Sequence, residues 1–458
     1  MKNTMKLSIV AIGLLSALNA NAAEDLSSMF SEGKTSGQIR EFSISRTMDY
    51  SNPVTKEYTR DANAIGGYLK FETAAYSGLS FGAAFYTTNG FGLSEDKATN
   101  VEVDPTLLGK DNESYSILGE AYLQYKAGNT TFKGGRQLLD TPMAGSDDAR
   151  MLPNLFEAYL VINTDITDTT LIGGHVTKFA QGTFGRAYAA NTGATPAAQL
   201  ANTALSATSG YSAVDSKDQV GDFVNMGDYA IGESTGGVSV ASATYTGLKN
   251  LKLQLWDYYA YDILNAVYAQ ADFSWKCLLS DNVKPYASAQ LIKEDDVGDK
   301  YAGSVNGLYW AAKVGAKVEN FDASVAYSET SENDAGETLE NAIITPWGGM
   351  PAFTQGMVTR HMFLAGTKAT KLAASYNWKA FGPNVSTTLY YAKFDMAENN
   401  GYTYDDASES GFDVIYAPAM VKNLQLRLRA NYADDFNVAT TGYTTSWDEY
   451  RFIANYNF

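Results

Sequence analysis

Apolar and polar residues alternate at every second position in segments that recur along most of the chain. The clearest segments span residues 79–87, 250–259, 267–275, 308–318 and 423–432. The last segment, from Tyr450, carries aromatic or apolar residues at alternate positions up to Phe458, with Arg451 and two asparagines between them. A period of two predicts β-strands with one apolar and one polar face. No stretch of helical period is comparably strong beyond residue 22, so we expect an all-β fold.

The connections between these segments are short and long in alternation. Short turns lie at residues 77–78, 127–129, 246–250, 280–282, 319–320, 381–384 and 421–423. Long polar connections span residues 88–114, 138–153, 180–236, 328–360, 395–410 and 433–447. An up-and-down outer-membrane barrel has short turns at one end and long loops at the other. About 18 alternating segments, an even number as in single-chain bacterial barrels, predict a closed antiparallel transmembrane β-barrel with short periplasmic turns and long outer loops.

Closure of such a barrel requires the last strand to pair with the first, which we place near residues 37–47. An open sheet edge in hydrocarbon would leave backbone N–H and C=O groups unpaired, at a cost of several kcal/mol each. We expect the aromatic face of the last strand to contact membrane lipid and lipopolysaccharide, and its polar face to line the lumen. A final aromatic strand ending on Phe458 also resembles the assembly signal of outer membrane proteins, so the barrel-assembly machinery is an expected partner.

The N-terminal segment has the composition of a secretory signal peptide. Two lysines precede an apolar run at residues 7–18, and Ala-Asn-Ala at residues 20–22 supplies a small-residue cleavage site. The run is shorter than the roughly 20 residues that a membrane-spanning helix needs. We therefore expect residues 1–22 to be removed and residues 23–458 to form a barrel domain in the bacterial outer membrane. A buried N-terminal helix of a cytosolic protein is the alternative.

Composition narrows the class of protein further. The chain has 458 residues, with 31 Tyr, 40 Gly and only 10 Pro, and Cys277 is its single cysteine. An exported chain without an internal disulfide needs another source of stability. The formal net charge of -17 argues against nucleic-acid binding, which requires a basic surface. A soluble β-sandwich or solenoid would also alternate, but it would not usually combine a signal peptide, a terminal Phe, many tyrosines and unequal loops at its two ends.

Residues 138–154 are the candidate for narrowing the channel. A barrel of this size is too wide for its own side chains to fill, so it holds water unless a segment folds inward. If the first strand runs outward, this segment is the third outer loop. Its leucine and methionine side chains suit contact with the inner wall, while Asp147, Asp148 and Arg150 would reach the channel. A solvated outer loop is the alternative, because composition does not reveal an inward fold.

Residues 135–159, with the sequence GRQLLDTPMAGSDDARMLPNLFEAY, resemble the third-loop region of OprD-type outer membrane porins, especially over residues 147–153. The length, the strand number, the signal peptide and the terminal Phe458 agree with this resemblance. It implies an 18-stranded channel, narrowed by inward loops, that admits small and often carboxylate-bearing nutrients. It also implies a row of basic residues on one wall, facing acids on an inward loop, and a loose homotrimer.

Several basic residues are candidates for that wall. A charge on the lipid face at mid-depth costs about 2–4 kcal/mol, so charged strand residues should face the lumen. Strand parity places the following side chains there: Arg427, Arg429, Arg451, Lys313, Lys317 and Lys371. Pairing with acids on neighbouring strands is their alternative role, and both roles are compatible, since exposed ion pairs add little stability. Arg136 shares the parity of Phe132, which places it at a rim.

These observations favour a passive diffusion channel for small hydrophilic solutes or ions. The only histidines, His175 and His361, adjoin no nucleophile motif, which disfavours a barrel-embedded hydrolase. A structural or adhesive barrel, whose loops at 180–236 and 328–360 bind a partner, stays an alternative, and residues 180–236 could instead form a lid. No cofactor is expected. Clustered loop acids such as those at 434–435 could hold a structural calcium ion, although no EF-hand-like loop occurs.

Overall fold

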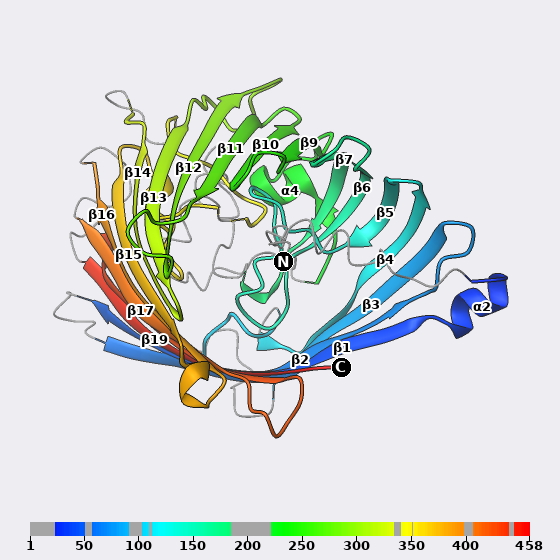
Figure 1. Ribbon diagram of the computed structural model, residues 1–458. Coiled ribbons are helices and arrows are strands. Elements are labelled where there is room, and N and C mark those ends of the chain that lie inside the picture. The colour runs from blue at the N-terminus through cyan, green and yellow to red at the C-terminus, as the bar shows by residue number, and fades with distance from the viewer. Residues whose placement is uncertain are drawn as a thin grey trace.

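The computed structural model forms the closed sheet that the alternation predicts, with strands curving around a central space (Figure 1). The structure describes residues 23–50, 57–90, 103–109, 112–184, 221–333, 340–349, 351–397, 406–438 and 444–458. Within these residues the antiparallel sheet has 19 strands, and the last strand pairs with the first. Since β8 pairs only with β7, the other 18 strands make the ring. The prediction of an all-β, closed barrel of about 18 strands is confirmed.

The strands and helices have the following bounds. The first strands are β1 (Lys34–Tyr50), β2 (Glu57–Glu72), β3 (Leu79–Gly90), β4 (Tyr115–Ala127), β5 (Thr130–Gln137), β6 (Leu155–Asn163), β7 (Thr169–Ala180), β8 (Val224–Asn225) and β9 (Val238–Tyr245). The others are β10 (Leu251–Ala260), β11 (Leu264–Ser274), β12 (Val283–Asp296), β13 (Leu308–Val318), β14 (Phe321–Thr330), β15 (Lys368–Asn377), β16 (Val385–Asp395), β17 (Ala407–Tyr416), β18 (Leu424–Val438) and β19 (Thr444–Asn457). The helices are α2 (Leu26–Ser31), α4 (Met226–Ile231) and the 3₁₀ turns η3 (His361–Phe363) and η4 (Trp378–Phe381).

The seam between β1 and β19 closes the barrel along nearly the whole length of both strands. The pairing register runs from Gln38 opposite Asn457 to Tyr50 opposite Thr445. The first strand therefore contains the predicted residues 37–47 and extends beyond them at both ends. Since both strands are paired on each side, neither leaves an open edge in the membrane.

The two faces of each strand differ as the parity argument predicts. On β18 and β19, Leu428, Tyr450 and Phe452 point outward and are exposed. Asn431 and Arg451, on the other face, are buried in the barrel interior. The apolar side chains of the outer wall thus form the surface that lipid covers, and most strand charges lie inside.

The two ends of the barrel differ in the length of their connections. Every short turn predicted from the sequence lies at one end, together with the start of β1 and the end of β19. The long connections leave from the other end, and residues 138–154 are the third of these, between β5 and β6. The expected long connection 433–447 is wrong in its bounds, because β18 continues to Val438 and β19 begins at Thr444. A register shift between Ala433 and Asn437 accommodates this extension.

The inner wall and the inward-folded loops share an apolar core near the loop end of the barrel. Met226 and Ile231 of α4 belong to it, as do Met143, Trp347 of the connection between β14 and β15, and Trp256 of β10. Figure 1 shows α4 inside the ring of strands, beside β7 and β9. No helix in the described part of the chain is long and apolar enough to cross a membrane.

Two predictions fall largely or wholly on residues that the structure does not describe. The signal peptide at 1–22 lies outside the described residues. Most of the predicted lid segment 180–236 also lies outside them, at 185–220. The remainder of that segment, from residue 221, contains α4 and the short strand β8.

Candidate permeation constriction

The third outer loop, residues 138–154, folds into the lumen and is called L3 below. It leaves the wall at the outer end of β5, yet Asp148 binds Arg40 of β1, and three strands separate β1 from β5 in the ring. Inside the loop, the Thr141 hydroxyl donates to the Ala144 carbonyl at 2.6 Å and Asp140 accepts from Ser146, which makes a compact turn. The inward fold, one of two alternatives left open by the sequence, is therefore present.

A second inward segment, called L7 below, comprises residues 340–349 and 351–360 of the seventh outer connection. It meets L3 inside the lumen. The Gly145 amide of L3 donates to the Trp347 carbonyl of L7 at 3.2 Å. Arg360 of L7 lies 3.7 Å from the carboxylate of Asp147 of L3. The two loops together bridge the lumen from β5–β6 to β14–β15.

L7 is tied to the wall by side chains of β15 and β17. The Glu409 carboxylate of β17 accepts the backbone amides of Met357 at 2.6 Å and Thr359 at 3.1 Å. The Lys371 ammonium of β15 donates to the Gln355 carbonyl. Lys371 thus points inward as predicted, but it binds the backbone of L7.

Three buried arginines surround one carboxylate behind L3. Glu449 of β19 pairs with Arg46 of β1, with Arg150 of L3 at 3.0 Å and with Arg451 at 2.9 Å. These four side chains are fully shielded from solvent. Asp104 of the second outer connection lies 3.2 Å from Arg46 and supplies a second carboxylate.

Two of the predicted site residues therefore lie elsewhere than expected. Arg150 was expected to reach the channel, but it is buried, because it spans from L3 to Glu449 and to the Thr106 hydroxyl at 3.0 Å. Arg451 faces inward as parity predicts, but it is buried beneath Met357 of L7. Both arginines hold the constriction loops against the wall.

Arg427 and Arg429 are accessible from the lumen. Both side chains pair with Asp413 of β17, Arg429 at 3.4 Å. The Arg427 side chain is 28% exposed and that of Arg429 is 16% exposed. Since the described residues offer this pair of cations a single carboxylate partner, this part of the wall carries a net positive charge.

Lys313 and Lys317 line the lumen nearer the short-turn end. The Lys317 ammonium lies 3.3 Å from Asp322 and its side chain is 61% exposed. The Lys313 ammonium lies 4.2 Å from the ring centre of Phe353 of L7. Both residues line a cavity of about 500 Å³, which also contains Lys284 and the carboxylates of Asp272 and Asp322.

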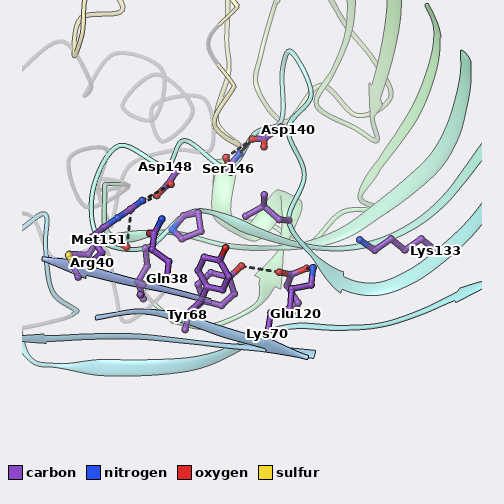
Figure 2. Close-up of a pocket in the computed structure, with 15 residues that line it drawn as sticks. Gln38, Arg40, Tyr68, Lys70, Glu120, Lys133, Asp140, Ser146, Asp148 and Met151 are labelled. Atoms are coloured by element: carbon purple, nitrogen blue, oxygen red, sulfur yellow. Dashed lines mark hydrogen bonds and ion pairs between the residues drawn. The ribbon is translucent and has the colours of Figure 1, made fainter. Parts of the chain in front are cut away.

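L3 separates two further cavities. One, called the L3 cavity below, measures about 390 Å³ and lies between L3 and strands β1–β5 (Figure 2). The other, of about 440 Å³, is lined by L3, L7 and strands β10–β12. Asp148 lines the first cavity and Asp147 the second. The predicted acid pair therefore faces two different parts of the lumen.

The L3 cavity contains charged residues of both signs. Figure 2 shows Arg40 and Asp148 on one side, with Tyr68, Lys70 and Glu120 below them. The Lys70 ammonium lies 3.1 Å from Glu120, whose other oxygen accepts the Tyr86 hydroxyl at 2.9 Å. Lys133 enters from β5, with its ammonium 3.9 Å from the ring centre of Tyr122.

The basic residues of this cavity are not among the residues predicted for the basic wall, although parity could have identified Lys133. Arg40 shares a face with the buried Phe42 and Ile44, and Lys133 shares a face with the buried Thr131. The rule that selected Arg427 would have placed Lys133 in the lumen, because Phe132 lies on the opposite face. It would not have decided the face of Arg40, because Glu41 puts a charge on the opposite face of that strand. Arg136 lies near the outer end of β5 with its guanidinium 4.3 Å from the Phe223 ring, which agrees with the rim position predicted for it.

At the described part of the site, the acid Asp147 has a raised pKa, and the described residues contain no metal-binding cluster. Burial raises the pKa of Asp147, and the nearby guanidinium groups of Arg360 and Arg150 partly offset that rise. Within the described residues, no group of three or more His, Cys, Asp or Glu side chains could hold a metal ion. The Nδ1 atom of His175 lies 3.1 Å from the Ser239 hydroxyl, and His361 is buried in η3. A structural calcium ion stays a prediction.

A closed 18-stranded transmembrane barrel, with inward loops that narrow a charged lumen, defines a channel of the porin class. The family model for outer membrane porins of the OprD family matches residues 29–458. The chain therefore belongs to the OprD family of bacterial outer membrane porins, and its place is the outer membrane.

Solved structures with the same fold come from Pseudomonas aeruginosa. OccK9 (OpdG) is 18% identical, with a TM-score of 0.72, over 94% of this chain and 99% of that one. OpdK with vanillate is 15% identical, with a TM-score of 0.71 and the same coverage. OccK2 (OpdF) in complex with glucuronate is 16% identical, with a TM-score of 0.70 and again the same coverage. At these identities the likeness establishes the fold alone. No curated protein matches this chain.

Proposed function

We propose that this porin is a passive diffusion channel for small hydrophilic solutes and that it favours solutes bearing a carboxylate. One observation carries the proposal: Arg427 and Arg429 line the lumen, are partly exposed, and share the single carboxylate of Asp413. In a narrow hydrated lumen, a local excess of positive charge attracts anions and orients them along the wall.

The cavity nearer the short-turn end supports the same selectivity. It presents the ammonium groups of Lys284, Lys313 and Lys317 against the carboxylates of Asp272 and Asp322. A carboxylate leaving the constriction would therefore find further cations below it. Two related structures, OpdK with vanillate and OccK2 with glucuronate, also hold carboxylates.

The predicted constriction residues take different roles in this proposal. Asp147 and Asp148 supply the negative side of the constriction, each next to an arginine. Arg150 anchors L3 to Glu449 and takes no part in contacting the solute. Charges of both signs at the constriction, with cations along one wall, would allow an anion to bind and to leave again.

Planar-bilayer recording tests the proposal. The purified protein should give stepwise conductance, and the reversal potential under a salt gradient should show anion preference. The double variant Arg427→Ala/Arg429→Ala should shift that potential toward cation preference, because the Asp413 carboxylate would then be uncompensated. The matched control is Lys379→Ala/Lys422→Ala, which removes two positive charges from short turns. Absence of conductance, or an equal shift in both variants, would contradict the proposal.

A further inference from the structure

The ion pair between Asp148 and Arg40 joins L3 to the barrel wall through both oxygens of the carboxylate. One terminal nitrogen of Arg40 lies 2.6 Å from Asp148 Oδ1, and the other lies 2.9 Å from Oδ2. This is the bidentate geometry in which a guanidinium binds a carboxylate. The Asp148 side chain is 45% exposed, whereas that of Arg40 is only 8% exposed.

Other groups hold the guanidinium in place independently of Asp148. Its Nε donates to the Asn455 side chain at 2.8 Å. One terminal nitrogen also donates to the carbonyl oxygens of Arg150 at 2.6 Å and Met151 at 3.3 Å. The guanidinium would therefore keep its orientation if the Asp148 carboxylate moved away. A buried cation without a counter-ion is costly, so an anion must replace any carboxylate that leaves.

A space for such a replacement adjoins the ion pair. The L3 cavity, at about 390 Å³, is within the size range of small-molecule sites. The rings of Tyr68 and Tyr86 stack in its wall with centroids 5.3 Å apart. Lys70 of β2 and Lys133 of β5 add two ammonium groups. The cavity thus offers an aromatic surface and further cations beside the guanidinium.

We propose that Asp148 is a displaceable internal ligand of Arg40, and that a small carboxylate entering the L3 cavity exchanges with it. The inference rests on the proposed passage of carboxylate solutes through the lumen. Asp148 then competes with each arriving solute, which lowers the affinity of the site and speeds release. Conduction requires this balance, because a solute must bind well enough to enter and weakly enough to leave.

The test measures blockade of the single-channel current by benzoate, with the uncharged analogue benzamide as a second probe. Asp148→Asn keeps the shape of the side chain and removes the competing charge. We expect it to bind benzoate about tenfold more tightly than the wild type, with benzamide unchanged, since charge-assisted hydrogen bonds to Arg40 become available. The matched control is Asp165→Asn, which removes an acid from the short turn between β6 and β7 and should leave benzoate affinity unchanged.

A double-variant cycle assigns the effect to the ion pair. Arg40→Gln should weaken benzoate binding, and Asp148→Asn should have no further effect in the Arg40→Gln background. Equal or weaker benzoate binding by Asp148→Asn would overturn the inference. A parallel gain for benzamide would also overturn it, because that would mean only that L3 had loosened. The proposed function fails on a different result, the reversal potential of the Arg427 and Arg429 variant.

Discussion

Arg360 of L7 lies 3.7 Å from Asp147 of L3, so the two loops that narrow the lumen are joined by an ion pair at their meeting point. The Arg360 side chain is only 3% exposed and also donates to the Thr345 carbonyl at 3.1 Å. The pair therefore links the position of one loop to that of the other, although the loops leave the wall on different sides of the barrel.

Loss of this ion pair should loosen the constriction. In Arg360→Gln, Asp147 loses its nearest cation, and the equilibrium should move toward separated loops by ~1 kcal/mol, or roughly fivefold. We expect larger single-channel conductance and more frequent brief current steps. Recordings of Lys126→Gln, which changes a charge at the end of β4, provide the control. Identical traces for Arg360→Gln and the wild type would show that the pair does not restrain the loops.

The raised pKa of Asp147 predicts that the stability of the folded protein depends on pH. Burial raises its pKa, so the folded protein holds this proton more tightly than the unfolded chain does. The stabilisation is complete below the pKa of the unfolded chain and is lost as the pH rises through the higher folded pKa. Asp147→Asn removes this titration. As the pH rises from about 4, the ordinary pKa of an aspartate, through the raised pKa of Asp147, the thermal unfolding temperature of Asp147→Asn should therefore rise relative to that of the wild type. A constant difference across that range would contradict the assignment.

The strands and their faces could be predicted because the membrane imposes them. Lipid excludes charge and unpaired backbone groups, so alternation alone determined that Arg427 and Lys313 face inward. Inward folding of L3 was different, since it depends on contacts between distant parts of the chain. Arg150 is the clearest case, because its partner Glu449 is 299 positions away and no local pattern links them. The joining of L3 to L7 was likewise invisible in either loop's composition.

The Glu449 cluster should be a major source of stability for the L3 anchor. Its carboxylate contacts Arg46, Arg150 and Arg451, all of which are buried. Glu449→Gln would remove the negative charge that these three buried arginines share. Breaking a buried pair in this way typically costs about 3–5 kcal/mol. We expect a large fall in the thermal unfolding temperature. Glu113→Gln, in the second outer connection, is the control for loss of one acid. Equal stability of the two variants would contradict a central role for Glu449.

Gly349 permits the close approach of L7 to L3. Its φ is +81°, and a Cβ atom there would lie 2.5 Å from the Pro142 carbonyl and 2.9 Å from the Ala144 amide of L3. Gly349→Ala should therefore push the two loops apart and change the single-channel conductance. Gly382→Ala is a matched control, because its φ is +111° but a Cβ atom would meet nothing within 4 Å. Both variants carry backbone strain, but only Gly349→Ala places a Cβ atom against L3. Only Gly349→Ala should therefore alter conductance. Equal conductance in both would show that the loops need no such contact.

The depth at which positions of β18 lie in the membrane can be tested with two leucines of the outer face. Leu428 is 45% exposed and adjoins the inward-facing Arg427 and Arg429, near the middle of the membrane-spanning part of the strand. Leu424 lies on the same face at the first residue of the strand, beside the short turn. An arginine on the lipid face costs about 2–4 kcal/mol at the bilayer midplane and about 0–1 kcal/mol near the interface.

Leu428→Arg should accordingly lower the free energy of unfolding from lipid bilayers by about 2–4 kcal/mol, and Leu424→Arg by no more than about 1 kcal/mol. Reversible unfolding in denaturant, with the protein in lipid vesicles, measures both values. Equal costs would mean that the two positions lie at similar depth or that Leu428 does not face hydrocarbon. The inward assignment of Arg427 and Arg429 would then lose its physical basis, because it depends on the alternate residues of this strand contacting lipid.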